Sequence, residues 1–232
     1  SFFPLSVDYQ EKFASAGRIP GSFFKREARL SNYEILICRL VDRALRPLFP
    51  EDYLCDVQVI INLISSDPEV APDALACLAA SAALAVSDIP IQEVISEVRV
   101  SRVNGEFVIN PSVSQMKESD MDFIIAASEK NIMMVEGESK ECSEEDLVQA
   151  IEKGHEAIRR QIAAQHELVR IAGAKSKYSD YAKPYENEDL KARLAAFASD
   201  RIYEVAKGAL KKSDRQDALN KIRDEFVESL GE

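Results

Sequence analysis

The stretch G-R-I-P-G-S-F-F-K-R-E-A-R, residues 17–29, leads directly into L-S-N-Y-E-I-L-I-C-R-L-V-D-R-A-L-R-P, residues 30–47, and these two segments organise the chain. The first places two adjacent phenylalanines beside two cations. A buried strand rarely carries cations next to its largest apolar residues, whereas loops that bind single-stranded nucleic acid stack bases on rings and hold phosphates with cations. The candidate nucleic-acid-binding residues of this loop are Phe23, Phe24, Lys25, Arg26 and Arg29.

The second segment predicts a helix with defined ends. Ser31, with Glu34 three residues later, forms the pattern of a capping box, in which each side chain bonds the other residue's free backbone N–H. Pro47 predicts the end of the helix, because its ring removes a donor and clashes with the preceding turn. One face of this helix carries the residues that we expect to be buried, namely Tyr33, Ile37, Leu40, Val41 and Ala44.

Three arginines lie on the other face of the same helix. Arg39, Arg43 and Arg46 are spaced four and three residues apart, so they share a side of the helix. We interpret them as a phosphate-facing edge that extends the aromatic and basic loop. The alternative is a structural role for some of them, as partners of Asp42 or Glu27 inside the fold.

The charge distribution supports a local site for a polyanion. The chain carries a formal net charge of −11, but residues 1–50 hold eight Lys and Arg against five Asp and Glu. The remaining 182 residues hold 21 against 35. A basic patch on an acidic body directs RNA to one place and repels it elsewhere.

Composition describes an ordinary globular protein of 232 residues, with 46% hydrophobic and 30% charged residues. No apolar run approaches the length of a membrane span, so we expect no membrane contact. The abrupt start, without an initiator Met or a secretory signal pattern, suggests a fragment. Four widely spaced cysteines without a C-x-x-C pair argue against zinc and disulfides and predict a reducing cytoplasm.

Periodicity predicts an α/β fold followed by helices. Residues 1–16 show no clear period and are expected to be surface chain or the remnant of an interrupted domain. A β-branched run over residues 56–64, apolar on both faces, predicts a central strand. The other expected elements are an alanine-rich helix over 74–86, a hairpin over 97–110 that turns at Asn104-Gly105, a strand pair over 122–128 and 132–138, and a long helix from Ser143 to Gly173.

The loss of apolar periodicity over residues 174–187 predicts a linker. The domains expected are therefore an α/β domain with mixed sheets over residues 1–173, incomplete at its N-terminus, the linker, and an all-α domain over 188–232. That last region reads as at least two amphipathic helices, broken near Lys211-Lys212-Ser213-Asp214.

An ordered series of motifs carries a resemblance to a known family. The two opening segments are followed by D-V-Q-V-I (56–60), A-S-A-A-L-A-V-S-D-I-P (80–90), N-P-S (110–112), E-S-D-M-D-F (118–123) and G-H-E-A-I (154–158). Together they resemble the first RNase PH-like core domain of the bacterial polynucleotide phosphorylase family. The resemblance is strong over about two thirds of the chain and looser in the helical remainder, which is similar to the family's helical domain.

The resemblance also shows what this chain lacks. A catalytic core of the family has a Gly/Ser-rich phosphate loop before the alanine-rich helix, where this chain has D-P-E-V-A-P-D, residues 67–73. Such a core also has two metal-holding aspartates six residues apart. Here Asp120 occupies the second place, but the first is Ser114. We therefore expect no catalytic and no metal-binding residues in this chain.

The resemblance implies part of a phosphate-dependent 3′-to-5′ exoribonuclease of mRNA degradation, a nucleotidyltransferase that is active as the intact protein. It implies Mg²⁺ and inorganic phosphate for that enzyme, with neither expected on this fragment. The implied partners are single-stranded RNA, two further copies in a homotrimer ring, a catalytic second core beyond residue 232, and other proteins of RNA-degradation complexes. The alternative is a catalytically silent RNase PH-like ring subunit of an exosome-type complex. A third possibility, an active tRNA-trimming enzyme, is weakened by the missing phosphate loop.

Overall fold

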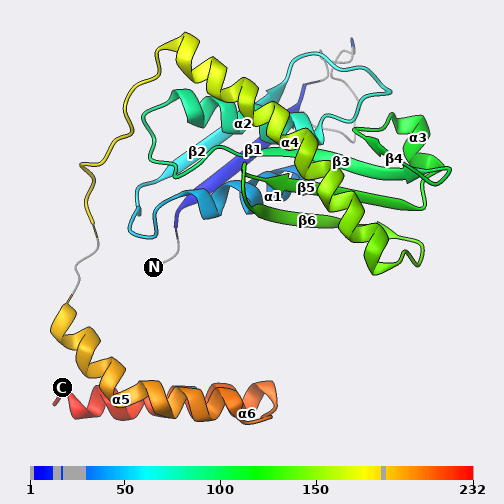
Figure 1. The fold of residues 1–232 in the computed structure, drawn as a ribbon. Helices are drawn as coiled ribbons and strands as arrows, with labels where there is room; N and C mark the ends of the chain where they lie inside the picture. Colours follow the sequence, from blue (N-terminus) through cyan, green and yellow to red (C-terminus); the bar gives the residue numbers. More distant parts are fainter. Residues whose placement is uncertain (1–2, 13–16, 18–29, 184–186, 232) are drawn as a thin grey trace, which may run out of the picture. The chain divides into compact units, whose positions relative to one another are not determined.

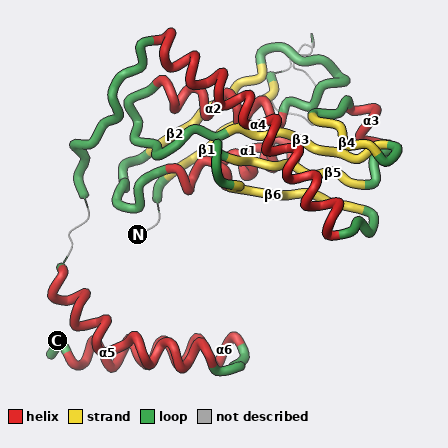
Figure 2. Tube along the Cα trace, in the orientation of Figure 1, coloured by secondary structure: helices red, strands yellow, loops and turns green. Residues whose placement is uncertain are grey.

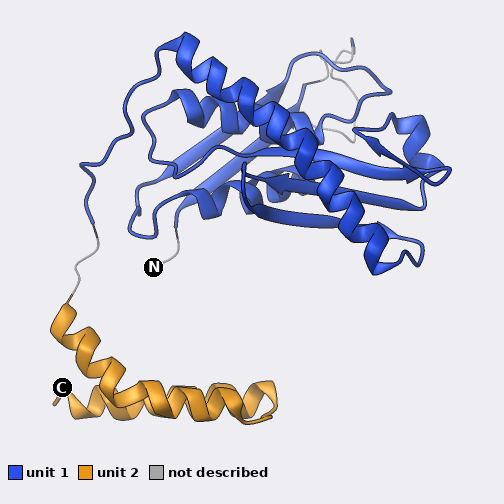
Figure 3. Cartoon of the chain, in the orientation of Figure 1, with its two compact units in different colours: residues 1–183 blue, residues 184–232 orange. Residues whose placement is uncertain are grey.

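The computed structural model describes residues 3–12, 17, 30–183 and 187–231 (Figure 1). The chain divides into two compact units, Ser1–Lys183 and Pro184–Glu232 (Figure 3). The first unit therefore extends past Gly173, where the sequence predicts the core to end, and includes most of the expected linker.

The first unit begins with a strand that the sequence pattern had not led us to expect. Strand β1 (Leu5–Glu11) runs parallel to β2 (Val57–Leu63), in a register that places Leu5 opposite Val57. The expectation of surface chain over residues 1–16 was wrong for this segment, because Leu5 and Tyr9 are buried in the core. The alternation of apolar and polar residues in L-S-V-D-Y-Q-E is the signal that identifies this half-buried strand.

Strand β2 differs from the central strand that its apolar run predicts. Val57 and Val59 are buried, but Ile60 on the opposite face is 59% exposed. Within the described residues β2 pairs with β1 alone. Only one face of β2 is therefore packed against the core. The expectation that both faces are buried was wrong.

The second sheet has four antiparallel strands in the order β4-β3-β5-β6. The β3–β4 hairpin turns at Asn104 and Gly105, both with positive φ (52° and 81°), as predicted for this dipeptide. The expected mixed arrangement thus takes the form of a parallel pair and a separate antiparallel sheet in the described part of the chain. The strands are β3 (Ser96–Val103), β4 (Glu106–Ile109), β5 (Met121–Ala127) and β6 (Ile132–Ser139).

Helices cover both faces of the antiparallel sheet (Figure 2). On one face, Ile124 and Ala126 of β5 join the core that contains the parallel pair and helices α1 and α2. On the other face, Ile125 and Ala127 pack against α4. The helices of this unit are α1 (Asn32–Leu45), the 3-10 turn η2 (Arg46–Leu48), α2 (Asp73–Val86), the short α3 (Val113–Lys117) and α4 (Glu144–Ala172).

The predicted helix ends are confirmed. In α1 the Ser31 hydroxyl accepts from Glu34 N at 3.2 Å, while Glu34 Oε2 accepts from Ser31 N at 2.6 Å. The same glutamate accepts from Glu11 N at 2.9 Å through its other oxygen, which ties the end of β1 to the start of α1. Helix α4 begins after Ser143 and ends at Gly173, which has a left-handed φ of 60°.

The second unit contains helices α5 (Glu188–Lys207) and α6 (Lys212–Ser229). They contact each other through the rings of Phe197 and Phe226, whose centroids lie 5.5 Å apart, and through an ion pair of Arg201 and Glu225 at 2.5 Å. The break between them covers residues 208–211, so it overlaps the predicted segment 211–214 only at Lys211. No helix in the described part of the chain is both long enough and apolar enough to cross a membrane.

Arg46 joins the first strand to the first helix. Its guanidinium donates to both carboxylate oxygens of Asp42, at 2.8 and 2.6 Å. It also donates to the carbonyl oxygens of Phe3 at 2.7 Å and Leu5 at 3.2 Å. These bonds hold the start of β1 against the last turn of α1, and the Arg46 side chain is 26% exposed.

We expect the substitution Arg46→Met to lower the free energy of unfolding by about 1–3 kcal/mol, since it leaves Asp42 and two carbonyls without their charged donor. The matched control is Arg39→Met on the same helix, because the exposed Arg39 forms no hydrogen bond or ion pair within the described residues. Urea unfolding followed by circular dichroism measures both. Equal stability of the two variants would contradict a structural role for Arg46.

Candidate functional site

Phe23, Phe24, Lys25, Arg26 and Arg29 lie outside the described residues. Their role in binding RNA stays a prediction from the sequence.

The three arginines of α1 lie in three different environments. Arg39 is exposed, and Arg43, whose side chain is 52% exposed, pairs with Glu136 on β6. Arg46 donates hydrogen bonds to Asp42 and to two backbone carbonyls. It thus has the structural role that we gave as the alternative to RNA binding. Tyr33, expected to be buried on the opposite face, is 41% exposed. RNA contact therefore stays a prediction, which the geometry favours most at Arg39 and least at Arg46.

The acidic loop before α2 is tied into the fold by its own carboxylates. Asp73 is buried in the first turn of α2, where one carboxylate oxygen pairs with Arg99 at 2.5 Å. Glu69 accepts from the backbone N–H of Ser114 at 3.1 Å. Hydrogen bonding by the Ser114 side chain first, and then by its backbone N–H, lowers the pKa of the Glu69 carboxyl. Asp67 accepts from the N–H of Glu69 at 2.8 Å. Carboxylates thus occupy the donors that a bound phosphate would need.

Arg99 on β3 lies at the centre of this region. Its guanidinium contacts Asp73 of α2 and Asp122 of β5, each at 2.5 Å, and its side chain is 17% exposed. A cavity of about 310 Å³ opens beside it. The residues that line this cavity are Glu69, Val70, Ala71, Asp73, Arg99, Asn110, Pro111, Ser112 and Gln115.

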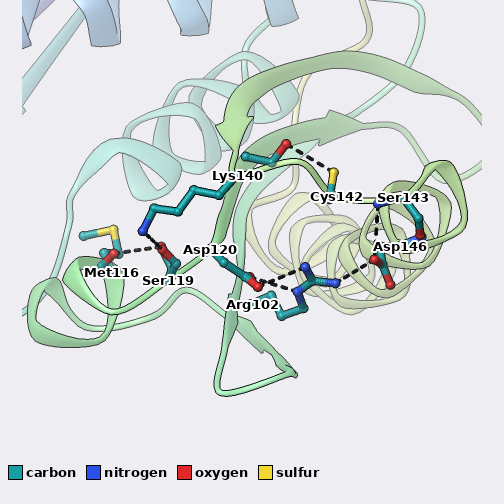
Figure 4. Close-up of polar contacts among 9 residues, drawn as sticks. Arg102, Met116, Ser119, Asp120, Lys140, Cys142, Ser143 and Asp146 are labelled. Carbon is teal, nitrogen blue, oxygen red and sulfur yellow. Dashed lines mark hydrogen bonds and ion pairs between the residues drawn. The ribbon is translucent and has the colours of Figure 1, made fainter.

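Asp120, which the sequence resemblance aligns with a metal-holding aspartate, is bound by a second arginine of β3 (Figure 4). Arg102 donates to both oxygens of Asp120, at 2.8 and 2.9 Å. It also pairs at 2.7 Å with Asp146 in the first turn of α4. The guanidinium of Arg102 lowers the pKa of Asp120 and neutralises its charge.

This ion-pair arrangement is a poor ligand set for a metal ion. A divalent cation needs several oxygen ligands with uncompensated negative charge. The described residues contain no group of three or more His, Cys, Asp and Glu side chains that could hold one. Ser114 contributes its backbone N–H to Glu69, and it offers no carboxylate.

Arg99 and Arg102 were not among the candidate residues predicted from the sequence. Both lie in the strand segment V-R-V-S-R-V, where most of the adjacent residues in the sequence are valines. A charged residue in a buried strand requires a partner of opposite sign, because an unpaired buried charge is very costly. That rule predicts acidic partners for both arginines. Only the fold identifies them, as Asp73 and Asp122 for Arg99 and as Asp120 and Asp146 for Arg102.

Glu97 lies two residues before Arg99, on the same strand and the same face. Its side chain is almost fully buried, and neither carboxyl oxygen has a hydrogen-bond partner among the described residues. Burial first, and then the negative charge of Asp73, raise the pKa of Glu97 to about 8, whereas the Cys77 thiol and Arg99 lower it by smaller amounts. Glu97 is therefore protonated and neutral at pH 7.

This pKa shift predicts a dependence of stability on pH. The pKa of Glu97 rises from 4.5 to about 8 on folding, so the folded chain binds a proton that the unfolded chain releases in this range. The resulting stabilisation is complete below about pH 4.5 and is lost as the pH rises through about 8. We expect the variant Glu97→Gln to lack this loss, and urea unfolding between about pH 5 and pH 9 measures it. The control is the exposed Glu152→Gln; identical pH profiles for both variants would contradict the assignment.

Two family models match consecutive parts of the first unit. Residues 1–90 match domain 1 of the 3′ exoribonuclease family, and residues 93–157 match domain 2. The core that the sequence predicts as one domain is thus matched by two consecutive domains of the family.

Curated relatives match through the helical unit as well. The polyribonucleotide nucleotidyltransferase of Christiangramia forsetii is 54% identical over 231 residues, which are 100% of this chain and 31% of the relative. The proteins of the same name from Cytophaga hutchinsonii and Bacteroides fragilis are 53% and 52% identical, with 99% and 100% of this chain and 32% and 33% of the relatives covered. The chain spans about a third of the length of these relatives. It belongs to the 3′ exoribonuclease family.

Proposed function

We propose that this chain is the first, non-catalytic core of a polyribonucleotide nucleotidyltransferase, together with the helical domain that follows it. The observation that carries the proposal is the match of about 50% identity along the whole chain, helices α5 and α6 included, to proteins of that name. The intact enzyme would degrade mRNA in the cytoplasm from its 3′ end with inorganic phosphate as the attacking group and Mg²⁺ as cofactor.

The internal ion pairs support a non-catalytic role for this core. Phosphorolysis needs a cradle for phosphate and stabilisation of the charge that develops on the reacting phosphodiester. Here Asp73 is committed to Arg99, and Asp120 is committed to Arg102. The catalysis itself would come from a second core, encoded beyond residue 232.

The role left for this core is to capture RNA and to form the ring. Phe23 and Phe24 would stack bases at the pore of a homotrimer, with Lys25, Arg26 and Arg29 on the phosphates. Arg39 on α1 would add a further cation for RNA, because this residue is exposed. Other proteins of RNA-degradation complexes would bind the assembled ring.

The alternative, a silent ring subunit of an exosome-type complex, accounts for the same core but not for the helices after it. A single-domain ring subunit has no need of such helices, whereas this chain continues into α5 and α6. The relatives match across these helices too. Both observations favour the polyribonucleotide nucleotidyltransferase.

We expect the double substitution Phe23→Ala with Phe24→Ala, made in the intact protein, to weaken the binding of single-stranded RNA at least tenfold. Stacking on an aromatic ring contributes roughly 1–3 kcal/mol per base. Fluorescence anisotropy with a labelled oligonucleotide measures the affinity. The control is Tyr203→Ala, which removes an aromatic side chain that is 63% exposed on α5. Equal affinity of the double variant and the control would assign the two phenylalanines to the core of the fold.

We expect the 232-residue chain alone to release no nucleoside diphosphate from poly(A) with magnesium and phosphate. The substitution Ser114→Asp should not restore activity, since Arg102 would still neutralise Asp120 and the loop of residues 67–73 would still repel phosphate. The intact protein in the same assay is the positive control. Phosphate-dependent release by the purified chain would refute the non-catalytic role, while inactivity of the intact protein would refute the proposed enzyme.

A further inference from the structure

We propose that residues 174–183 are a strap that binds the surface of the first unit and thereby sets the length of the tether to the helical unit. The sequence predicts a linker here, and the segment contains no helix or strand. Its side chains and backbone nevertheless make specific contacts with residues far away in the sequence. These contacts form two attachments, defined by Lys177 and Tyr181.

The first attachment closes the C-terminal end of α2. Lys177 Nζ donates to the carbonyl oxygens of Leu84 at 2.7 Å, Ala85 at 3.2 Å and Ser87 at 2.9 Å. The last carbonyls of a helix lack partners within the helix and carry partial negative charge. Helix α2 has no basic residue of its own in its last turn, so the strap supplies the cation that this end needs.

The backbone continues the first attachment, because Tyr178 N donates to the carbonyl of Asp88 at 2.6 Å. Burial lowers the pKa of Lys177, and the charge of Asp88 opposes this shift. The ammonium group is thus partly removed from water, and three carbonyl oxygens replace its water ligands. A lysine side chain that moved freely over the surface would not lie within hydrogen-bonding distance of three carbonyl oxygens.

The second attachment joins the strap to the loop after η2. The Tyr181 hydroxyl donates to Asp52 Oδ1 at 2.8 Å, and Lys183 Nζ pairs with Asp52 Oδ2 at 2.9 Å. These two partners, Lys183 first, lower the pKa of Asp52. The ring of Tyr181 meets that of Tyr53 edge-on, with centroids 4.9 Å apart. Both oxygens of one carboxylate and one aromatic face are therefore used by the strap.

The consequence is a short tether. If the chain left the first unit at Gly173, fourteen residue steps would separate it from Asn187, the N-cap of α5. A chain of that length reaches at most about 50 Å, whereas the four steps from Lys183 reach at most about 14 Å. The volume open to the start of α5 is then roughly fortyfold smaller, because it scales with the cube of the reach.

Two measurements on the 232-residue chain test the proposal. In hydrogen–deuterium exchange resolved to single amides, we expect the Tyr178 amide to exchange at least tenfold more slowly than in an unstructured chain, because it is hydrogen-bonded. The double variant Lys177→Met with Tyr181→Phe should lose this protection while α4 keeps its own. Exchange of the wild-type strap at the unprotected rate would overturn the proposal, whether or not the variant folds.

Small-angle X-ray scattering measures the tether itself. For a flexible chain, the change from four to fourteen residues lengthens the mean end-to-end distance by about 10 Å. We expect the maximum dimension of the double variant to increase on this scale. The matched control is Lys175→Met with Tyr178→Phe, since neither the Lys175 ammonium nor the Tyr178 hydroxyl forms a hydrogen bond or ion pair in the described residues. Scattering of the double variant identical to that of this control would overturn the strap as the determinant of tether length.

Discussion

The ion pair between Arg99 and Asp73 is the contact on which the arrangement of the first unit depends. It connects β3, in the middle of the antiparallel sheet, to the first turn of α2. A buried guanidinium is tolerated only with partners in good geometry, and removal of one partner leaves a costly charge behind. A carboxylate in the first turn of a helix is also favoured by the helix dipole. The position of α2 on the sheet is therefore specified by electrostatics as well as by apolar packing.

Arg102 repeats this arrangement on the opposite face of β3. It pairs with Asp146 in the first turn of α4, so that each face of the sheet holds a helix by an arginine from the same strand. Asp122 of β5 and Asp120, which directly precedes β5, complete the two clusters. Carboxylates that could otherwise take part in catalysis therefore stabilise the fold of this core through their ion pairs. The acidic loop before α2 is also held by its carboxylates, because Asp73 pairs with Arg99 while Asp67 and Glu69 accept backbone N–H groups.

The sequence predicted secondary-structure elements correctly where backbone conformation or hydrogen bonds between near neighbours determine them. Asn104-Gly105 identified the hairpin because only such residues adopt two successive positive φ values at low cost, and Ser31 with Glu34 identified the helix start through hydrogen bonds only three residues apart. Contacts between distant segments were less accessible. The pairing of β1 with β2, and the partners of Arg99 and Arg102, depend on how the chain returns on itself. The strap was missed for the same reason, since its acceptors are backbone carbonyls about ninety residues away.

The parallel pairing of β1 with β2 has a consequence for the order of folding. Leu5 and Val57 are paired across 52 positions of sequence, with α1 between them, whereas the β3–β4 hairpin closes over two residues. The entropy lost on closing a loop grows with its length, so contacts between sequence neighbours form before distant ones. We expect β3, β4, β5 and β6 to assemble first and to offer α2 its binding face. The first strand then docks late, and an incompletely folded chain would expose Leu5 and Tyr9 together with the edge of β2.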